Sequence, residues 1–305
     1  MRIALIGQSD FGKDVLDALI KDQKDIVGVF CPSDKGEGDF DPIKKSSQSH
    51  KIDVYQFDRL RDDKAIETFS SLNVDLCVMA FVTDIVPMDI INSPTLGTIQ
   101  YHPSLLPLHR GPSSINWPII MGKKETGLSI FWPDDGLDTG PILLQKKVVI
   151  EDTDTLGTLY FKKLYPMGVD ALVEAVNLVS KGTAPKIKQE QELATYEGWC
   201  KSKDAKIDWS KPAMEICNLI RGCDPSPGAN TTLQSQKISL YKSHLTNETS
   251  SMPYGSITTI NQSSFSVSVN GGTLIVERVK MTGNSKQYVA DFLKTTNLEI
   301  GDRFI

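Results

Sequence analysis

His102 ends a short strand-like run, and its surroundings make it the first candidate for chemistry. Residues 97–102 read Gly-Thr-Ile-Gln-Tyr-His, and Pro103 closes the run because proline cannot continue a strand ladder. Side chains alternate across a strand, so Thr98, Gln100 and His102 are predicted to project from one face. A structural histidine with satisfied hydrogen bonds is the competing interpretation, since polar groups on a buried strand need partners.

An acidic loop follows a second strand-like run, residues 127–132. Residues 133–140 read Pro-Asp-Asp-Gly-Leu-Asp-Thr-Gly, with three aspartates and two glycines. A solvated acidic turn is the ordinary interpretation. A carboxylate brought beside His102 would instead hold the orientation of the imidazole and favour its charged form. These two segments are therefore the candidate site.

Neither a metal nor a nicotinamide cofactor is expected. The four histidines, His50, His102, His109 and His244, show no ligand spacing such as HExxH. Residues 7–12 read Gly-Gln-Ser-Asp-Phe-Gly, so a serine stands where the dinucleotide fingerprint has its middle glycine. That glycine is what allows the backbone to approach a pyrophosphate.

Strand-like and helical patterns alternate through the first half of the chain and must position these residues. Residues 2–6, 26–30, 54–57 and 74–81 are predicted as strands, and 13–21 and 63–72 as helices. The nearly continuous apolar character of 74–81 is typical of a strand buried on both faces. The prediction is an α/β fold with a Rossmann-like, doubly wound, mostly parallel sheet. Ligands bind such sheets at the carboxyl ends of the strands, where His102 stands.

The pattern changes near residues 182–185, and we expect a smaller second domain after it. The predicted domains are 1–188 and 205–305, joined by a polar linker at 189–204. A helix at 212–221 and a Pro/Gly-rich turn at 224–228 precede short strands. These strands are predicted at 237–241, 255–260, 264–269 and 274–279. Their spacing predicts an OB-like β-barrel.

Composition and charge disfavour several classes of function. The 305 residues carry a net charge of −5, with 23 basic and 30 acidic residues up to position 204 and 10 and 8 after it. Neither part has the positive field of a dedicated nucleic-acid binder. No targeting signal is visible, and the longest strongly apolar stretch, 76–82, is too short to span a bilayer. Five scattered cysteines without a CxxC pattern predict free thiols and a cytoplasmic location.

Two motifs carry a resemblance to a known family. Residues 101–111 read Tyr-His-Pro-Ser-Leu-Leu-Pro-Leu-His-Arg-Gly and 130–140 read Ile-Phe-Trp-Pro-Asp-Asp-Gly-Leu-Asp-Thr-Gly, with His102 36 residues before Asp138. Both strings and their spacing resemble the 10-formyltetrahydrofolate-dependent formyltransferases. The resemblance is greatest to the hydrolase domain of the 10-formyltetrahydrofolate dehydrogenases and extends to the methionyl-tRNA formyltransferases. It continues to the end of the chain at Lys-Ile-Asp-Trp (206–209), Ile-Arg-Gly (220–222), Pro-Gly-Ala (227–229), Asn-Gly-Gly-Thr-Leu (270–274) and Gly-Asp-Arg-Phe (301–304).

The resemblance implies a folate substrate and assigns roles to individual residues. His102 would hydrogen-bond or protonate the formyl oxygen as it gains negative charge. Asp138 would orient His102 and a nearby water or amine, and help to accept a proton. The folate would be bound by the loops 79–87 and 133–140 and the segment after His102. The expected folate-binding residues are Met79, Ala80, Phe81, Val82, Ile85, Ser104, Leu105, Asp134, Asp135 and Gly136.

Gln100 departs from the family pattern. The family's transferases carry asparagine two residues before the histidine, where its amide helps to hold the oxyanion, and the dehydrogenase domain carries an apolar residue. Gln100 keeps the amide but adds one methylene, a displacement larger than the roughly 0.5 Å that a preorganised site tolerates. It is either a displaced oxyanion donor and third catalytic residue, or a side chain that fills the pocket.

Three functions remain open. Water would accept the formyl group, giving formate and tetrahydrofolate; an amine would accept it, on methionyl-tRNA or a small molecule; or the chain would bind folate without catalysis. Residues 31–51, between the second and third strands, hold four acids (Asp34, Glu37, Asp39, Asp41) and four lysines, and are interpreted as a solvated loop. Such a segment neutralises few phosphates, so tRNA is disfavoured as a partner and hydrolysis is preferred. No pattern for a carrier domain or an aldehyde dehydrogenase domain is present, so formate without a nicotinamide requirement is the expected product.

Overall fold

The computed structural model describes residues 1–34, 36, 38 and 40–305. The chain divides into two compact units. The first comprises Met1–Gly111, Gly127–Val148 and Lys162–Tyr196, and the second Pro112–Thr126, Val149–Phe161 and Glu197–Ile305. The domain limits predicted from the sequence stay a prediction. The two units are described separately below.

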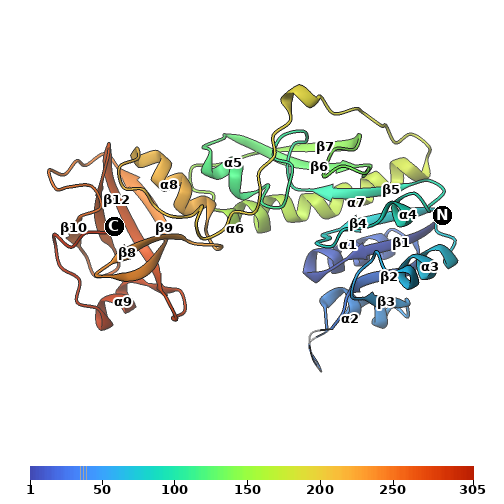
Figure 1. Cartoon of the computed structure of the whole chain (residues 1–305), viewed down its shortest axis with the longest axis horizontal. Coiled ribbons are helices and arrows are strands. Elements are labelled where there is room, and N and C mark those ends of the chain that lie inside the picture. The colour runs from blue at the N-terminus through green and yellow to red at the C-terminus, as the bar shows by residue number, and fades with distance from the viewer. Residues whose placement is uncertain (35, 37, 39) are drawn as a thin grey trace. The chain divides into compact units, whose positions relative to one another are not determined.

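The first unit is built on a mostly parallel, Rossmann-like sheet (Figure 1). Within the described residues its strand order is β3-β2-β1-β4-β5-β6-β7. The strands are β1 (Arg2–Gly7), β2 (Asp25–Pro32), β3 (Val54–Phe57), β4 (Leu76–Ala80), β5 (Thr98–His102), β6 (Glu125–Phe131) and β7 (Ile142–Val149). The pairs from β3 to β5 are parallel, whereas β6 runs antiparallel to β5. The strand order reverses between β1 and β4, which is the ligand-binding edge of such sheets.

Helices cover both faces of this sheet. They are α1 (Ser9–Lys21), α2 (Pro42–Ser49), α3 (Asp63–Ser71), α4 (Met88–Ile91) and α7 (Tyr165–Ser180), with a π-helical turn η1 (Tyr160–Leu164) before α7 and a 3₁₀ turn η2 (Gln191–Leu193). Alternate residues of β1 enter different cores: Ile3 and Leu5 pack in the core that includes α1, α2 and α7, and Ala4 and Ile6 in the core that includes α3 and α4. This alternation confirms the doubly wound arrangement, because β1 is buried on both faces.

The turn after β1 binds the carboxylate of Asp41. Ser9 has a left-handed φ of 59°, and its backbone N–H donates to both carboxylate oxygens of Asp41, at 2.8 and 3.0 Å. A Cβ on Gly7 would lie 2.6 Å from the Ala80 carbonyl oxygen, so this glycine serves the packing of β1 on β4. The start of α1 therefore binds a side-chain carboxylate at the position where dinucleotide folds bind phosphate.

The segment 31–51, expected as a solvated loop, contains helix α2. Asp41 caps the helix by accepting from the Ile43 N–H at 3.0 Å, and Pro42 occupies its first turn, where a missing N–H costs nothing. Ile43 is fully buried, which anchors the helix on the sheet. Asp34 pairs with Lys44. Lys35, Glu37 and Asp39 lie outside the described residues.

The second unit contains an antiparallel sheet. Within the described residues its order is β10-β11-β12-β9-β8, and β13 pairs with β12. The strands are β8 (Ala229–Leu233), β9 (Gln236–Thr246), β10 (Ile257–Ile260), β11 (Phe265–Val269), β12 (Gly272–Met281) and β13 (Gln287–Tyr288). Its helices are α5 (Asn116–Ile120), α6 (Leu156–Leu159), α8 (Ala213–Gly222) and α9 (Val289–Thr295). The predicted closure into an OB-like barrel stays a prediction.

Candidate active site

His102 is the last residue of β5 and is 6% exposed. Its Nε2 lies 2.9 Å from the backbone oxygen of His109. A carbonyl oxygen only accepts hydrogen bonds, so Nε2 carries a hydrogen and donates it. This contact fixes the ring and turns Nδ1 towards the loop that follows β6.

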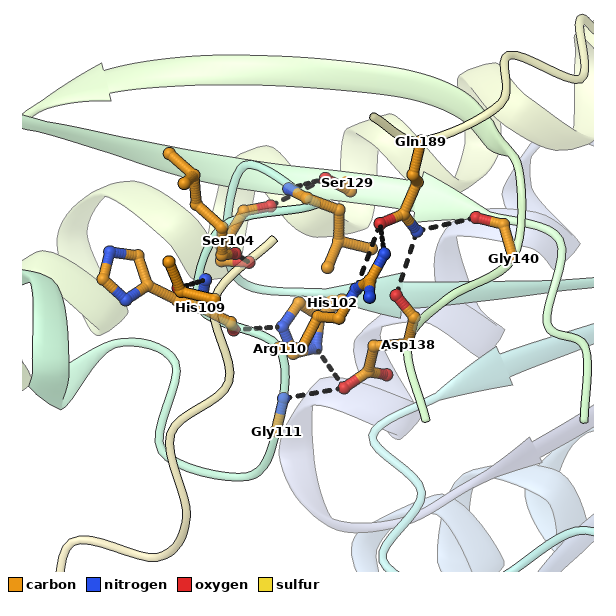
Figure 2. A network of polar contacts seen from close by, with 12 residues as sticks. His102, Ser104, His109, Arg110, Gly111, Ser129, Asp138, Gly140 and Gln189 are labelled. Carbon is orange, nitrogen blue, oxygen red and sulfur yellow. Dashed lines mark hydrogen bonds and ion pairs between the residues drawn. The ribbon is translucent and has the colours of Figure 1, made fainter. Parts of the chain in front are cut away.

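Asp138 lies opposite that ring (Figure 2). One of its carboxylate oxygens, Oδ2, is 3.6 Å from His102 Nδ1, and the side chain is 7% exposed. The same oxygen accepts a 2.9 Å hydrogen bond from the Gly111 N–H. The structure therefore brings together the two residues that the sequence singled out.

The arrangement leaves Nδ1 as the reactive nitrogen. Because 3.6 Å is too long for a hydrogen bond, Nδ1 is not committed to Asp138. A ring protonated on Nε2 alone would point its Nδ1 lone pair at the carboxylate, whereas an imidazolium would point an N–H. Either Nδ1 or Oδ2 can thus carry a proton and exchange it with a substrate atom placed beside them.

Three residues around the site have left-handed backbone conformations. The φ angles are 62° at Phe81, 56° at His109 and 56° at Asp138. Side chains other than glycine rarely adopt this region, at a cost of about 1–3 kcal/mol each. The surrounding hydrogen bonds must offset that strain. Two of the strained residues belong to the site itself: His109 supplies the carbonyl that contacts His102, and Asp138 bears the carboxylate.

The Asp138 loop is closed tightly at its base. The Trp132 N–H donates to the Pro141 oxygen at 2.9 Å, which joins the two ends of segment 133–140. A Cβ on Gly140 would lie 1.8 Å from the Trp132 oxygen, so only glycine fits there. Within the loop, Asp134 Oδ1 accepts from the Thr139 hydroxyl at 2.5 Å. The loop is thereby shaped by its own side chains.

Gln100 is half-buried on β5, in register with Met79 of β4 and Phe131 of β6. Its amide forms no hydrogen bond to any residue in the described part of the chain. The amide is therefore available to a ligand.

The expected folate-binding residues fall into two groups. Met79, Ala80 and Ser104 are buried, at 4%, 0% and 0% exposure, and the Ser104 hydroxyl donates to the Leu108 oxygen at 2.7 Å. The structure thus turns these three away from solvent. Leu105 is half-buried, and its side chain packs against Gly127. A Cβ on Gly127 would lie 2.6 Å from that side chain.

The remaining residues of this set reach the surface. Ile85 is 73% exposed and Phe81 44%. Asp134 is half-buried, and Asp135 and Gly136 are exposed. Phe81 and Val82 line a cavity of about 330 Å³ at the carboxyl ends of β1, β2 and β3, a volume in the range of small-molecule sites.

The sequence did not identify Arg110 and Gln189 as site residues. Arg110 is 8% exposed and Gln189 3%, and Gln189 was placed at the start of the linker. The amide oxygen of Gln189 accepts from Arg110 at 2.7 and 3.2 Å. Its nitrogen donates to the backbone oxygens of Asp138 at 2.9 Å and Gly140 at 2.7 Å (Figure 2). A polar residue in a polar segment gives no periodic signal, so nothing in the pattern marked Gln189.

Among the described residues no group of three or more His, Cys, Asp or Glu side chains is placed to hold a metal ion. No helix in the described ranges has the length and apolar character that a membrane crossing requires.

A buried His–Asp pair thus lies at the carboxyl end of a strand in a Rossmann-like sheet, an arrangement that can perform acid–base chemistry. Residues 1–176 match the formyl transferase family and 200–297 match the formyl transferase C-terminal domain. The chain belongs to the formyl transferase family.

Two kinds of curated relatives are similar to this chain. The mitochondrial 10-formyltetrahydrofolate dehydrogenase of Mus musculus is 46% identical over 260 residues, which cover 84% of this chain and 28% of that protein. The chain therefore spans about a quarter of the length of these relatives. The methionyl-tRNA formyltransferase of Clostridioides difficile is 33% identical over 306 residues, covering 99% of both chains.

Solved structures share the fold. HypX from Aquifex aeolicus, in complex with tetrahydrofolic acid, has a TM-score of 0.70 at 14% identity, over 96% of this chain and 47% of that one. WlaRD, a sugar 3N-formyl transferase solved in the presence of dTDP and 5-N-formyl-THF, has a TM-score of 0.70 at 20% identity, over 93% of this chain and 99% of that one.

Proposed function

We propose that this protein removes the formyl group of 10-formyltetrahydrofolate by hydrolysis, releasing formate and tetrahydrofolate. The buried His102–Asp138 pair, with Nδ1 3.6 Å from Oδ2, carries the proposal. It is a buried acid–base pair at the end of β5. The 46% identity to a dehydrogenase named for this folate supports the choice of substrate.

The chemistry follows from the positions of the protons. Water attacks the formyl carbon and transfers a proton to the Asp138 carboxylate, and the formyl oxygen gains negative charge. The His102 imidazolium donates its Nδ1–H to that oxygen. The bond from carbon to the folate nitrogen then breaks as the nitrogen takes the proton held by Asp138, and a hydroxyl on the formyl carbon returns its proton to His102 Nδ1 as the carbonyl re-forms. One water is consumed, and tetrahydrofolate, formate and one proton are released.

Gln100 is the third catalytic residue of this proposal. Its amide is half-buried and has no hydrogen bond within the described residues, so its N–H groups can reach the developing oxyanion. The alternative, that Gln100 only fills the pocket, is tested in the Discussion.

We assign the folate to the segments 79–87 and 133–140, with Phe81, Val82, Ile85, Asp134, Asp135 and Gly136 in contact and Met79, Ala80, Ser104 and Leu105 supporting their backbone. The cavity beside Phe81 and Val82 supports the assignment of segment 79–87 alone, because it is lined by neither His102, Asp138 nor any residue of 133–140. Backbone amides can match the donors and acceptors at the edge of the pterin. Buried side chains therefore contribute to folate binding indirectly, by fixing the backbone at the strand ends.

Formyl transfer to an amine is the second candidate. The alignment with methionyl-tRNA formyltransferase over 99% of both chains favours it. Against tRNA stands the segment 31–51, in which acids and lysines are equal in number and Lys44 is paired with Asp34. Non-catalytic folate binding is the third candidate, and it is weakened by the paired His102 and Asp138.

The proposal also covers the domain limits, the closure of the second sheet and the location of the protein. We propose domains at 1–188 and 205–305 with a linker at 189–204, and closure of the antiparallel sheet into an OB-like barrel. The five free cysteines support a reducing, cytoplasmic location.

A product assay tests the function. Purified protein is given 10-formyltetrahydrofolate alone, with methionyl-tRNA, or with small amines, and formate and formylated amines are measured. We expect formate, no formyl-methionine, and a loss of turnover of at least about 100-fold in His102→Ala and Asp138→Asn. The exposed controls His50→Ala and Asp25→Asn should retain activity. No turnover in the wild type would overturn the enzyme proposal, and robust formylation of methionyl-tRNA would overturn the acceptor.

A further inference from the structure

The side-chain amide of Gln189 uses its whole hydrogen-bonding capacity. Its oxygen accepts from Arg110 Nη2 at 2.7 Å and Nε at 3.2 Å, and its nitrogen donates to the oxygens of Asp138 and Gly140 at 2.9 and 2.7 Å. A guanidinium only donates and a backbone carbonyl only accepts, so the amide has one possible orientation. Glutamate would turn an acceptor towards the two carbonyls, and leucine would bond to neither side.

The hydrogen-bond partners of Gln189 belong to the two segments that form the candidate active site, the one that contacts His102 and the one that carries Asp138. Arg110 stands between His109, whose carbonyl binds His102 Nε2, and Gly111, whose N–H binds Asp138 Oδ2. On the other side, the Asp138 carbonyl is bonded directly to the amide. One side chain thus connects the peptide units that hold the imidazole with the backbone that carries the carboxylate (Figure 2).

The strained backbone explains why such a connection is needed. His109 and Asp138 both have φ near 56°, a conformation that relaxes unless neighbouring bonds hold it. The N–H of Arg110 also donates to the Thr195 oxygen, and the His109 N–H to the Thr195 hydroxyl at 2.8 Å. Segment 189–195 therefore holds the His109–Gly111 backbone from outside, and Gln189 extends that hold to Asp138.

We propose that Gln189 is a positioning residue that sets the distance between His102 and Asp138. The proposal rests on the proposed function, in which these two residues carry the chemistry. Gln189 touches neither reacting group, and it acts through the Asp138 backbone and Arg110.

The chain offers a matched control. Gln191 lies two residues further on, is exposed, and accepts from Arg110 Nη1 at 3.1 Å. It is thus a glutamine on the same arginine, and it has no hydrogen bond to the Asp138 loop within the described residues.

The test compares Gln189→Leu, Gln189→Glu and Gln191→Leu in the full chain. Displacement of a catalytic group by about 1 Å costs on the order of 100-fold in rate, so we expect kcat to fall about 10- to 100-fold in both Gln189 variants. KM for the folate should change less than about threefold, and Gln191→Leu should lose less than about twofold in kcat. A Gln189 variant that is less stable but has unchanged kcat per folded molecule would show a merely structural role and overturn the proposal.

A double-mutant cycle with Asp138→Asn gives the second readout. If Gln189 acts through Asp138, the Gln189→Leu change costs less than about twofold in the Asp138→Asn background, measured in single turnovers. Full additivity would overturn the proposal.

A crystal structure of Gln189→Leu separates this proposal from the function. A wild type without turnover overturns the proposed function, yet the separation of Nδ1 and Oδ2, 3.6 Å in the wild type, can still be measured. We expect it to change by about 1 Å in Gln189→Leu. An unchanged separation, with Asp138 still at positive φ, would overturn the positioning role.

Discussion

At the scale of single residues, the proposed chemistry depends on which nitrogen of His102 is occupied. The His109 carbonyl accepts from Nε2 at 2.9 Å, and this contact leaves Nδ1 facing Asp138. The carbonyl belongs to a residue at a φ of 56°, so the strained backbone of His109 fixes which imidazole nitrogen faces the carboxylate.

Gln100 offers the most specific test at this scale. Gln100→Leu keeps the approximate volume and removes the amide, and Gln100→Glu keeps the shape and removes both N–H donors. Loss of one oxyanion donor typically costs about 100- to 1000-fold in kcat. We expect kcat for formate release to fall in both variants by at least about tenfold, the smaller value reflecting a displaced donor. If Gln100→Leu retained full activity while tetrahydrofolate binding was intact, Gln100 would be a pocket-filling residue.

The sequence predicted the reacting residues better than their supports. His102 was a candidate because it ends a strand, whereas Asp138 was chosen among the three aspartates of its loop by the family resemblance, and the two lie 3.6 Å apart. Arg110 and Gln189 act through hydrogen bonds between segments 79 residues apart, and no local pattern encodes such a pairing. Ser104, expected at the ligand, donates its hydroxyl to the Leu108 oxygen.

At the scale of elements, the strands were predicted more reliably than the helices. The strand-like runs predicted at 54–57 and 97–102 correspond closely to β3 and β5. Helix α2 was not predicted although Asp41 and Pro42 form a helix start signal. The mixed charges of the segment favoured a solvated loop instead. Helix α7 and strand β7 were not predicted. Alternate residues of β7 are only half-buried, so the strand lacks a clear alternation of apolar and polar residues. It also lacks a long continuous apolar run.

Helices α1 and α7 are joined by a hydrogen bond to a carboxylate, and its pH dependence can be tested. Asp14 of α1 accepts from the Tyr165 hydroxyl of α7 at 2.6 Å and from Lys13 at 2.8 Å. Partial burial by itself raises the pKa of Asp14, but these two hydrogen bonds outweigh it, so the pKa lies below the ordinary 3.8. A carboxyl with a depressed pKa stabilises the fold above its unfolded value, and this contribution is lost as the pH falls through the folded value.

We therefore expect Asp14→Asn to be less stable than the wild type at neutral pH, and the difference to shrink below about pH 4. Because 41% of the side chain is exposed, solvent screening limits the difference to less than about 1 kcal/mol. Urea unfolding at several pH values measures it, and Tyr165→Phe should reduce the difference. A difference that stays constant down to about pH 3 would contradict the assignment.

At the scale of the whole molecule, charge bears on the acceptor. The first 204 residues are more acidic than basic, 30 to 23, and the remainder is nearly balanced, 8 to 10. A tRNA acceptor requires phosphate neutralisation and gives a steep salt dependence. Water requires neither, so the rate of formate release should be nearly independent of salt.

The five thiols of the chain provide a test that covers both units. Burial raises the pKa of Cys31 to about 12 and also raises that of Cys77 and Cys217. Cys200 differs, because it lies 4.0 Å from the sulfur of Cys223, is only half-buried, and has a pKa lowered by that hydrogen bond. The same contact, together with burial, raises the pKa of Cys223.

Thiolates react and thiols do not, so Cys200 should be alkylated at least about tenfold faster than the other four cysteines in the folded protein near pH 8. Peptide mass spectrometry after brief iodoacetamide treatment identifies the modified site, and Cys200→Ser should abolish the fast reaction. When Cys200 is a thiolate, Cys223 can donate to it, so Cys223→Ala should slow the reaction by removing the donor that stabilises the thiolate. Fast modification of Cys31 or Cys217 would instead mean that the strand β2 or the helix α8 opens to solvent far more readily than their burial in the two cores implies.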